Sequence, residues 1–265
     1  MLTTDQFVMI NFPKTGSTFA RTALLRAHQR GRIGRVLERF GVLRPEVQEH
    51  WMVPFFFTST QEAAAGKVAQ HGTFHQIPAA HRLKPVFTVV RDPVQRVISA
   101  YEFRSWERNP FPDVARIKAE FPSFPDLSFE NFLRMGRTFN RRYAQPEGMQ
   151  VEIGGLTTQF IRFYARDPLK TILALREDTD WTKEYDRHFP EIRFLHTERL
   201  NRELYDFLLE MGYPKERIAF ILEMGKINRS KRTRSNYCTA EQIARIQHDE
   251  RFFYQLFPEY LQPDH

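Results

Sequence analysis

The chain of 265 residues carries a formal net charge of +7 at pH 7, and its length is sufficient for one α/β domain with a substantial core. It has no run of about 18 apolar residues and no basic leader followed by a hydrophobic segment, so we expect neither a membrane span nor a signal peptide. Cys238 is the only cysteine, which excludes an internal disulfide and a multi-cysteine metal site and favours a reducing, cytoplasmic compartment.

The first predicted junction between a strand and a helix lies near the start of the chain. Phe7–Phe12 is a short apolar run that predicts a buried strand, and the pattern from Thr18 to Gln29 predicts an amphipathic helix. A turn between them, Pro13–Thr18, directs backbone N–H groups and the positive end of the helix dipole toward one spot. The sequence therefore predicts a site for a phosphate-like anion.

The side chains of this turn fit the same interpretation. Lys14 supplies a mobile positive charge, and Gly16 permits a close approach of the backbone. Neutral hydroxyl donors are available from Thr15, Ser17 and Thr18. Because the lysine precedes the glycine, the turn differs from the nucleotide triphosphatase loop G-x-x-x-x-G-K-[ST].

A second junction of the same kind follows at residues 85–101. Pro85–Val90 predicts a buried strand, Arg91-Asp92-Pro93 a turn, and Val94–Tyr101 a helix that has proline near its first turn. Arg91 leaves the end of the strand, and Ser99 lies about two helical turns further on. The planar guanidinium suits a terminal phosphate, and the serine hydroxyl adds a donor.

Residues 102–150 interrupt the strand and helix pattern. Asn109–Pro125 carries four prolines, and Ser128–Met135 predicts a short helix. We expect an irregular insertion above the ligand site that the two junctions form, where a second substrate would bind. We expect a minority of its arginines to line a groove for that second substrate, the acceptor: Arg104, Arg108, Arg116, Arg134, Arg137, Arg141 and Arg142.

The remaining pattern predicts further elements. Strands are expected at Lys67–His71 and Ile192–His196, and helices at Leu156–Tyr164, Glu198–Met211 and Ala240–Phe257, the last opened by a Thr239-x-x-Gln242 capping box. Strands that alternate with helices predict an α/β fold: a single domain, residues 1–265, with a central parallel sheet flanked by helices. Ligands in such sheets bind at the carboxyl ends of the strands.

The two junctions read P-K-T-G-S-T and R-D-P-V-Q-R-V-I-S-A-Y, and both resemble the motifs of the PAPS-dependent sulfotransferases. They resemble in particular the carbohydrate branch, which includes the heparan sulfate 2-O-sulfotransferases and bacterial relatives. The resemblance implies a P-loop-like sulfotransferase fold. It also implies that Lys14–Thr18 bind the 5′-phosphosulfate and that Arg91 and Ser99 bind the 3′-phosphate.

Three other segments are similar to the family with lower specificity. The segment from His71 to Ile77 looks like the one that carries the catalytic histidine, with His75 as the rival base. Residues 156–160 look like a mid-chain segment of relatives. Near the end, residues 227–232 look like a loop that closes over the nucleotide, which implies nucleotide contacts by Ser230, Lys231 and Arg232.

The resemblance implies in-line transfer of the sulfuryl group from PAPS to an acceptor hydroxyl of a carbohydrate, with His71 as base, Lys14 at the leaving oxygen and no metal. Eukaryotic Golgi relatives are typically membrane-anchored, so the resemblance further implies a bacterial cytoplasmic enzyme, with a trimmed catalytic domain as the alternative. A nucleotide kinase of related fold and a catalytically silent module that binds anionic glycans are the alternatives. Nucleic acid is not expected as a partner, because the chain has no zinc finger, RNP-type aromatic motif or concentrated basic tail.

Overall fold

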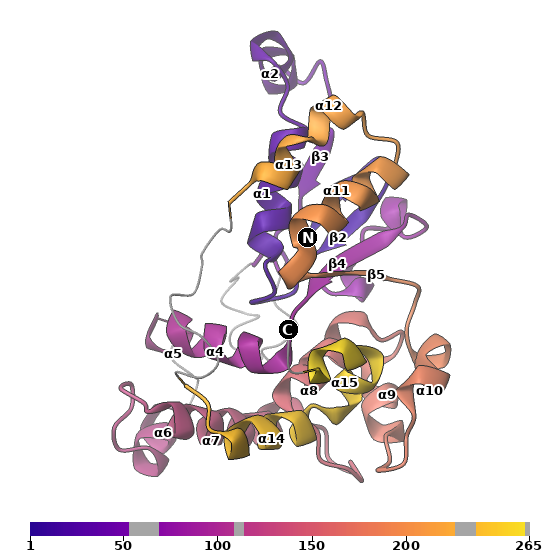
Figure 1. The fold of residues 1–265 in the computed structure, drawn as a ribbon. Coiled ribbons are helices and arrows are strands. Elements are labelled where there is room, and N and C mark those ends of the chain that lie inside the picture. The colour runs from indigo at the N-terminus through magenta and orange to yellow at the C-terminus, as the bar shows by residue number, and fades with distance from the viewer. Residues whose placement is uncertain (53–68, 109–113, 226–236, 263–265) are drawn as a thin grey trace. The chain divides into compact units, whose positions relative to one another are not determined.

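The computed structural model describes residues 1–52, 69–108, 114–225 and 237–262, which form two compact units (Figure 1). The first unit comprises residues 1–52, 69–91 and 191–225 and contains the sheet. The second comprises residues 92–108, 114–190 and 237–262 and is helical. The fold class is α/β, as the sequence predicted, with a central sheet flanked by helices.

The sheet has five strands in the order β3-β1-β2-β4-β5. The strands are β1 (Leu2–Thr4), β2 (Val8–Ile10), β3 (Val47–Glu49), β4 (Val86–Val90) and β5 (Arg193–His196). The three strands predicted at residues 7–12, 85–90 and 192–196 form its parallel part, β2, β4 and β5. The sequence analysis did not predict β1 and β3, which pair antiparallel, so the sheet is mixed.

The strand predicted at Lys67–His71 is wrong for its last two residues. Residues 67 and 68 lie outside the described part of the chain, and Ala69 forms a single antiparallel bridge with Met52. Gln70 and His71 belong to no strand. The Gln70 carbonyl instead accepts hydrogen bonds from the Asn11 side chain, at 3.2 Å, and from the N-terminal amine of Met1, so it takes no part in a strand ladder.

One face of the sheet packs against α1 (Ser17–Ala27) and α11 (Leu200–Glu210), which lie beside it in Figure 1. Because side chains alternate along a strand, Phe7 and Phe87 project to this same face, where their ring centroids lie 5.5 Å apart. The Phe207 ring of α11 lies 4.6 Å from that of Phe87. Burial of these rings fixes α1, and therefore the turn that precedes it, against the sheet.

Shorter elements complete the first unit. They are α2 (Arg32–Arg39), the 3₁₀ turns η1 (Phe74–Gln76), η2 (Ala79–His81) and η4 (Thr197–Arg199), and the helices α12 (Lys215–Ile218) and α13 (Phe220–Glu223). The helix predicted at Glu198–Met211 thus corresponds to η4 followed by α11.

The second unit consists of α4 (Pro93–Phe103), α5 (Ser105–Arg108), α6 (Val114–Glu120), α7 (Phe129–Phe139), the π-helix η3 (Asn140–Ala144), α8 (Gly155–Tyr164), α9 (Pro168–Ala174), α10 (Trp181–His188), α14 (Ala240–Asp249), α15 (Arg251–Leu256) and the 3₁₀ turn η6 (Pro258–Leu261). The described part of residues 102–150 is largely helical, where the sequence analysis expected irregular chain. Trp106 and Phe121 belong to a buried apolar cluster there, so this stretch has a core of its own.

The helix predicted at Ala240–Phe257 divides at Glu250, although its capping box at Thr239 and Gln242 is present as predicted. Glu250 is 4% exposed, and its carboxylate accepts hydrogen bonds from the N–H groups of Leu156 and Thr157 at 3.0 and 2.6 Å and from the Thr157 hydroxyl at 2.7 Å. It thereby caps the N-terminus of α8. Burial raises the pKa of Glu250, and the hydrogen bonds from Thr157 and Leu156 oppose that shift.

Replacing Glu250 with Ala should lower the free energy of unfolding by about 3 kcal/mol, because two buried N–H groups at the start of α8 would lose their acceptor. Urea denaturation measures the change. Glu241→Ala is the matched control: its carboxylate is 84% exposed and contacts Arg245 four residues along α14, so its loss should cost about 0.5 kcal/mol or less. Equal effects of the two substitutions would contradict the capping of α8 by Glu250.

Candidate functional site

The turn between β2 and α1 has an unusual backbone. Lys14 and Gly16 both lie in the left-handed region, with φ of 64° and 87°. For lysine this conformation is uncommon and carries strain, which the surrounding structure must compensate. A strained residue in the turn that the sequence predicted as an anion site marks this turn as the first element of the candidate functional site.

Two of the predicted hydroxyl donors hold the turn together. The Thr15 and Ser17 hydroxyls both donate to the Phe12 carbonyl, at 2.9 and 3.0 Å, and both residues are buried. Thr18, by contrast, is exposed. The hydroxyl hydrogens of Thr15 and Ser17 thus point toward Phe12, and the donors best placed for a ligand are the backbone N–H groups of the turn.

The N-terminus of α1 suits an anion. Gly16 is its N-cap and provides no side-chain cap, and the first turn contains no acidic residue. The first N–H groups of a helix have no acceptor within that helix, and the helix dipole adds partial positive charge at the same place. A sulfate or phosphate group fits these donors.

Arg91 follows β4 directly, at the same edge of the sheet. A contact from the end of β5 links the two segments: the Thr197 hydroxyl lies within hydrogen-bonding distance of both the Thr15 carbonyl and the Val90 carbonyl, the latter at 2.8 Å. Val90 is the last residue of β4. The structure therefore brings the backbone before Arg91 next to the anion-binding turn, as expected from the parallel sheet that the sequence predicted.

The second motif continues into α4 of the second unit. Asp92 caps this helix by accepting from the N–H groups of Val94 and Gln95, and it also accepts from the Tyr254 hydroxyl at 3.1 Å. Ser99 is half-buried on the same helix.

Arg96 on α4 is a residue to which the sequence analysis assigned no role. It is buried and donates to the Gln159 side chain of α8. This contact joins α4 to α8 within the second unit, so Arg96 supports the helix that carries Ser99.

His71 lies beside the end of β2. Its Nδ1 lies 2.8 Å from the Asn11 carbonyl oxygen. A carbonyl can only accept, so Nδ1 carries the proton and the lone pair of the neutral ring is on Nε2. The rival histidine, His75, is exposed on η1.

Asn11 is a residue of this region that sequence reasoning missed. It is 1% exposed, its amide donates to the Gln70 carbonyl, and its backbone carbonyl holds His71. Its side-chain oxygen Oδ1 is buried and has no hydrogen-bond partner within the described residues. The signal available in the sequence was its position: it is a polar residue directly after a buried strand, before Pro13.

A small open cavity of about 200 Å³ lies on the chain that follows His71. Phe74, His75, Ile77 and Arg82 line it. An aromatic ring, an aliphatic side chain and a guanidinium together form a surface that can contact a ring bearing polar or anionic groups.

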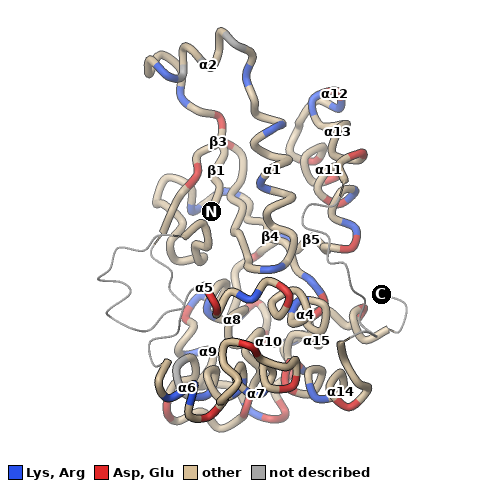
Figure 2. The backbone as a smooth tube through the Cα atoms, turned by 90° about the vertical axis from the view of Figure 1, so that its left-hand side faces the viewer, with Lys and Arg blue, Asp and Glu red and all other residues tan. Residues whose placement is uncertain are grey.

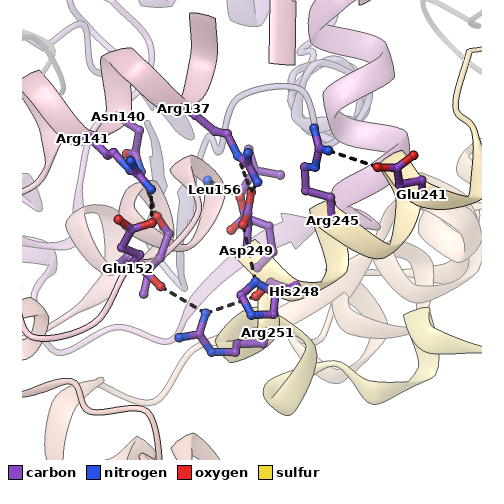
Figure 3. A network of polar contacts seen from close by, with 12 residues as sticks. Arg137, Asn140, Arg141, Glu152, Leu156, Glu241, Arg245, His248, Asp249 and Arg251 are labelled. Carbon is purple, nitrogen blue, oxygen red and sulfur yellow. Dashed lines mark hydrogen bonds and ion pairs between the residues drawn. The ribbon is translucent and has the colours of Figure 1, made fainter. Parts of the chain in front are cut away.

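Most of the predicted acceptor arginines bind carboxylates of the second unit. Arg137 donates twice to Asp249 at 2.8 Å, and Arg141 pairs with Glu152; both pairs are shown in Figure 3. The others are paired or stacked in the same way: Arg104 with Glu107 and Asp126, Arg116 with Glu120, and Arg134 at 5.6 Å from the centre of the Phe121 ring. Acidic segments accordingly accompany basic ones along α6 and α14 (Figure 2).

Several predicted residues cannot be placed. Ser230, Lys231 and Arg232, with the rest of the predicted nucleotide-closing segment, lie outside the described residues, and so do the side chains of Arg108 and Arg142. In the part of the chain that is described, no three His, Cys, Asp or Glu side chains gather as a metal site would require. Within the same residues, every helix is too short or too polar to cross a bilayer.

A model of the sulfotransferase family matches residues 1–262. The chain belongs to this family. Among solved structures it is similar to the mouse sulfotransferase SULT7A1 in complex with PAP, with 12% sequence identity, a TM-score of 0.43, and coverage of 98% of this chain and 86% of the mouse chain. A search of curated protein sequences gives no match.

Replacing Gly16 with Ala should destabilise the anion-binding turn. A left-handed alanine costs about 1–2 kcal/mol, and its Cβ would lie 3.3 Å from Leu200 Cδ2 and 3.4 Å from Thr197 Cγ2. Urea denaturation should show this loss in the free energy of unfolding.

Gly136→Ala is the control for this substitution. Gly136 is exposed within α7, and a Cβ added there would have no described atom from outside its own helix turn within 4 Å. Alanine at this position should stabilise the chain by up to about 1 kcal/mol, because glycine is unfavourable inside a helix. A loss of stability in Gly136→Ala equal to that in Gly16→Ala would contradict the special conformation of the turn.

Proposed function

We propose that this sulfotransferase moves the sulfuryl group of PAPS to a hydroxyl of a carbohydrate acceptor. Family membership supports sulfuryl transfer. The observation that carries the choice of donor is the left-handed turn at the carboxyl end of β2, whose helix N-terminus has no side-chain cap and lies beside the end of β4. The donor substrate has anions at both its 5′ and 3′ positions, which matches the two motifs that flank these strand ends.

At the 5′ end, we assign binding to the backbone of Lys14–Thr18. Lys14 stabilises the negative charge that develops on the leaving phosphate oxygen as the S–O bond breaks. Little covalent work falls to the protein in such a transfer, so alignment of donor and acceptor by this turn supplies much of the rate.

At the 3′ end, we assign the phosphate to Arg91 and Ser99. A bidentate guanidinium distinguishes a terminal phosphate from a ribose hydroxyl by charge and by geometry. We assign Ser230, Lys231 and Arg232 to the same nucleotide, on the similarity of their segment to the family motif. We also propose a bacterial cytoplasmic location, because the single cysteine fits a reducing compartment.

On the acceptor side, His71 accepts the proton of the attacking hydroxyl while the acceptor oxygen forms its bond to sulfur. The hydrogen bond from Nδ1 to Asn11 supports this role, because it orients the ring and leaves Nε2 as the basic nitrogen. The cavity lined by Phe74, Ile77 and Arg82 supports a sugar ring as acceptor, since aromatic and guanidinium groups both contact such rings. No step requires a metal ion.

Binding of nucleotides tests the donor. Adenosine 3′,5′-bisphosphate should bind more tightly than AMP or ATP in calorimetry, because only it carries the 3′-phosphate. Arg91→Ala should remove most of that preference, about tenfold or more, since a hydrogen bond to a charged group contributes roughly 1.5–3 kcal/mol. Arg116→Ala, which removes a guanidinium paired with Glu120 on α6, should leave it unchanged.

Equal affinity for all three nucleotides would refute the assignment of PAPS. Preference for ATP would favour the nucleotide kinase. Binding of an anionic glycan with no transfer from labelled PAPS, over a panel of glycans, phenols and alcohols, would favour the silent binding module.

Turnover tests the base. His71→Ala should lower kcat at least about tenfold, as expected for a lost general base, while the affinity for adenosine 3′,5′-bisphosphate changes little. His75→Ala tests the rival base and should retain most of the wild-type kcat, although loss of a side chain that lines the acceptor cavity should raise the acceptor KM. The reverse result, with activity lost in His75→Ala and kept in His71→Ala, would reassign the base. Lys14→Ala should reduce both kcat and nucleotide affinity.

A further inference from the structure

The residue that joins the two strand ends, Thr197, has no part in either sequence motif. It begins η4, directly after β5. Its hydroxyl lies 2.8 Å from the Val90 carbonyl and also within hydrogen-bonding distance of the Thr15 carbonyl. A hydroxyl has one hydrogen, so this hydrogen is shared between the two acceptors. One side chain thus holds both the anion-binding turn and the strand that leads to Arg91.

The contact to Thr15 fixes a backbone donor of the turn. The Thr15 carbonyl and the Gly16 N–H belong to one planar peptide unit, and in a trans unit these two groups point in opposite directions. Bonding of the carbonyl to Thr197 therefore turns the Gly16 N–H to the side away from η4. Thr197 also packs on Gly16, where an added Cβ would lie 3.4 Å from the threonine methyl carbon.

The turn that carries Thr197 is held by a carboxylate of α11. The Glu203 carboxylate, on α11, accepts from the His196 N–H at 2.5 Å and from Arg199 Nε at 2.8 Å, and so spans the η4 turn. These hydrogen bonds from His196 and Arg199, against the opposing effect of burial, hold the pKa of Glu203 below its usual value. The carboxylate is therefore ionised at neutral pH and braces the turn that presents Thr197.

We propose that Thr197 is a positioning residue for the nucleotide: it sets the orientation of the Thr15–Gly16 peptide, and thus of a donor to the 5′-phosphosulfate, relative to the strand end that carries Arg91. This inference rests on the proposed function. Thr197 acts through the backbone of the turn and of β4 and touches no reacting atom. Loss of its hydroxyl therefore impairs nucleotide binding more than it impairs binding of the acceptor.

The test compares Thr197→Val, which removes the hydroxyl but keeps the shape, with Thr197→Ser, which keeps the hydroxyl. Thr197→Val should raise the Kd for adenosine 3′,5′-bisphosphate and the KM for PAPS by about fivefold or more, with the acceptor KM unchanged. Thr197→Ser should remain within about twofold of the wild type. Thr182→Val, which removes an exposed hydroxyl bonded to Asp180, is the control and should have no effect.

Two measurements distinguish a general loss of stability from a specific loss of nucleotide binding: the Tm without ligand and the rise in Tm that the nucleotide produces. Positioning predicts a smaller rise for Thr197→Val even when the ligand-free Tm is close to that of the wild type. Unchanged nucleotide affinity in Thr197→Val would overturn the inference, and so would an equal loss in Thr197→Ser. Failure of the wild-type chain itself to bind adenosine 3′,5′-bisphosphate would refute the proposed function instead.

Discussion

Parallel pairing of β2 with β4 is the constraint on which the candidate site depends. It sends the carboxyl ends of both strands to one edge of the sheet, so the turn after Ile10 and the residue after Val90 become neighbours although they are about 80 positions apart in the sequence. α1 and α11 pack on the face that carries Phe7 and Phe87, and this packing keeps the N-terminus of α1 at that edge of the sheet. The position of the anion-binding turn is therefore fixed by packing in the core rather than by contacts within the turn.

The second unit has no sheet among its described residues. Its arginines are matched locally by carboxylates, as in the pairs of Arg137 with Asp249 and of Arg104 with Glu107. Exposed pairs of this kind add little stability each. Their effect is to neutralise guanidinium groups. The net charge of +7 therefore overstates how many of these groups are available to an anionic acceptor. Net charge alone is thus a poor guide to where this sulfotransferase binds its acceptor.

Sequence reasoning succeeded where the signal is local. Apolar runs ended by Pro13 and by Arg91 identified β2 and β4, and the Thr239 capping box identified the start of α14. It failed where structure depends on contacts between distant segments. The three-residue strands β1 and β3 are too short to show a period. In the candidate site, Thr197 and Asn11 could not be assigned, because their partners lie 182 and 60 positions away.

The capping of α8 by Glu250 has an evolutionary consequence. A Cβ on Gly154 would overlap the Glu250 carboxylate, so neither position can change alone without loss. A side chain at 154 would displace the Glu250 carboxylate, and either that displacement or a shorter residue at 250 would leave the N–H groups of Leu156 and Thr157 without their acceptor. The two positions are therefore epistatic. Lineages of this chain should either keep the glycine and glutamate together or replace both, with a new cap for α8 supplied from the side chain at 154 itself.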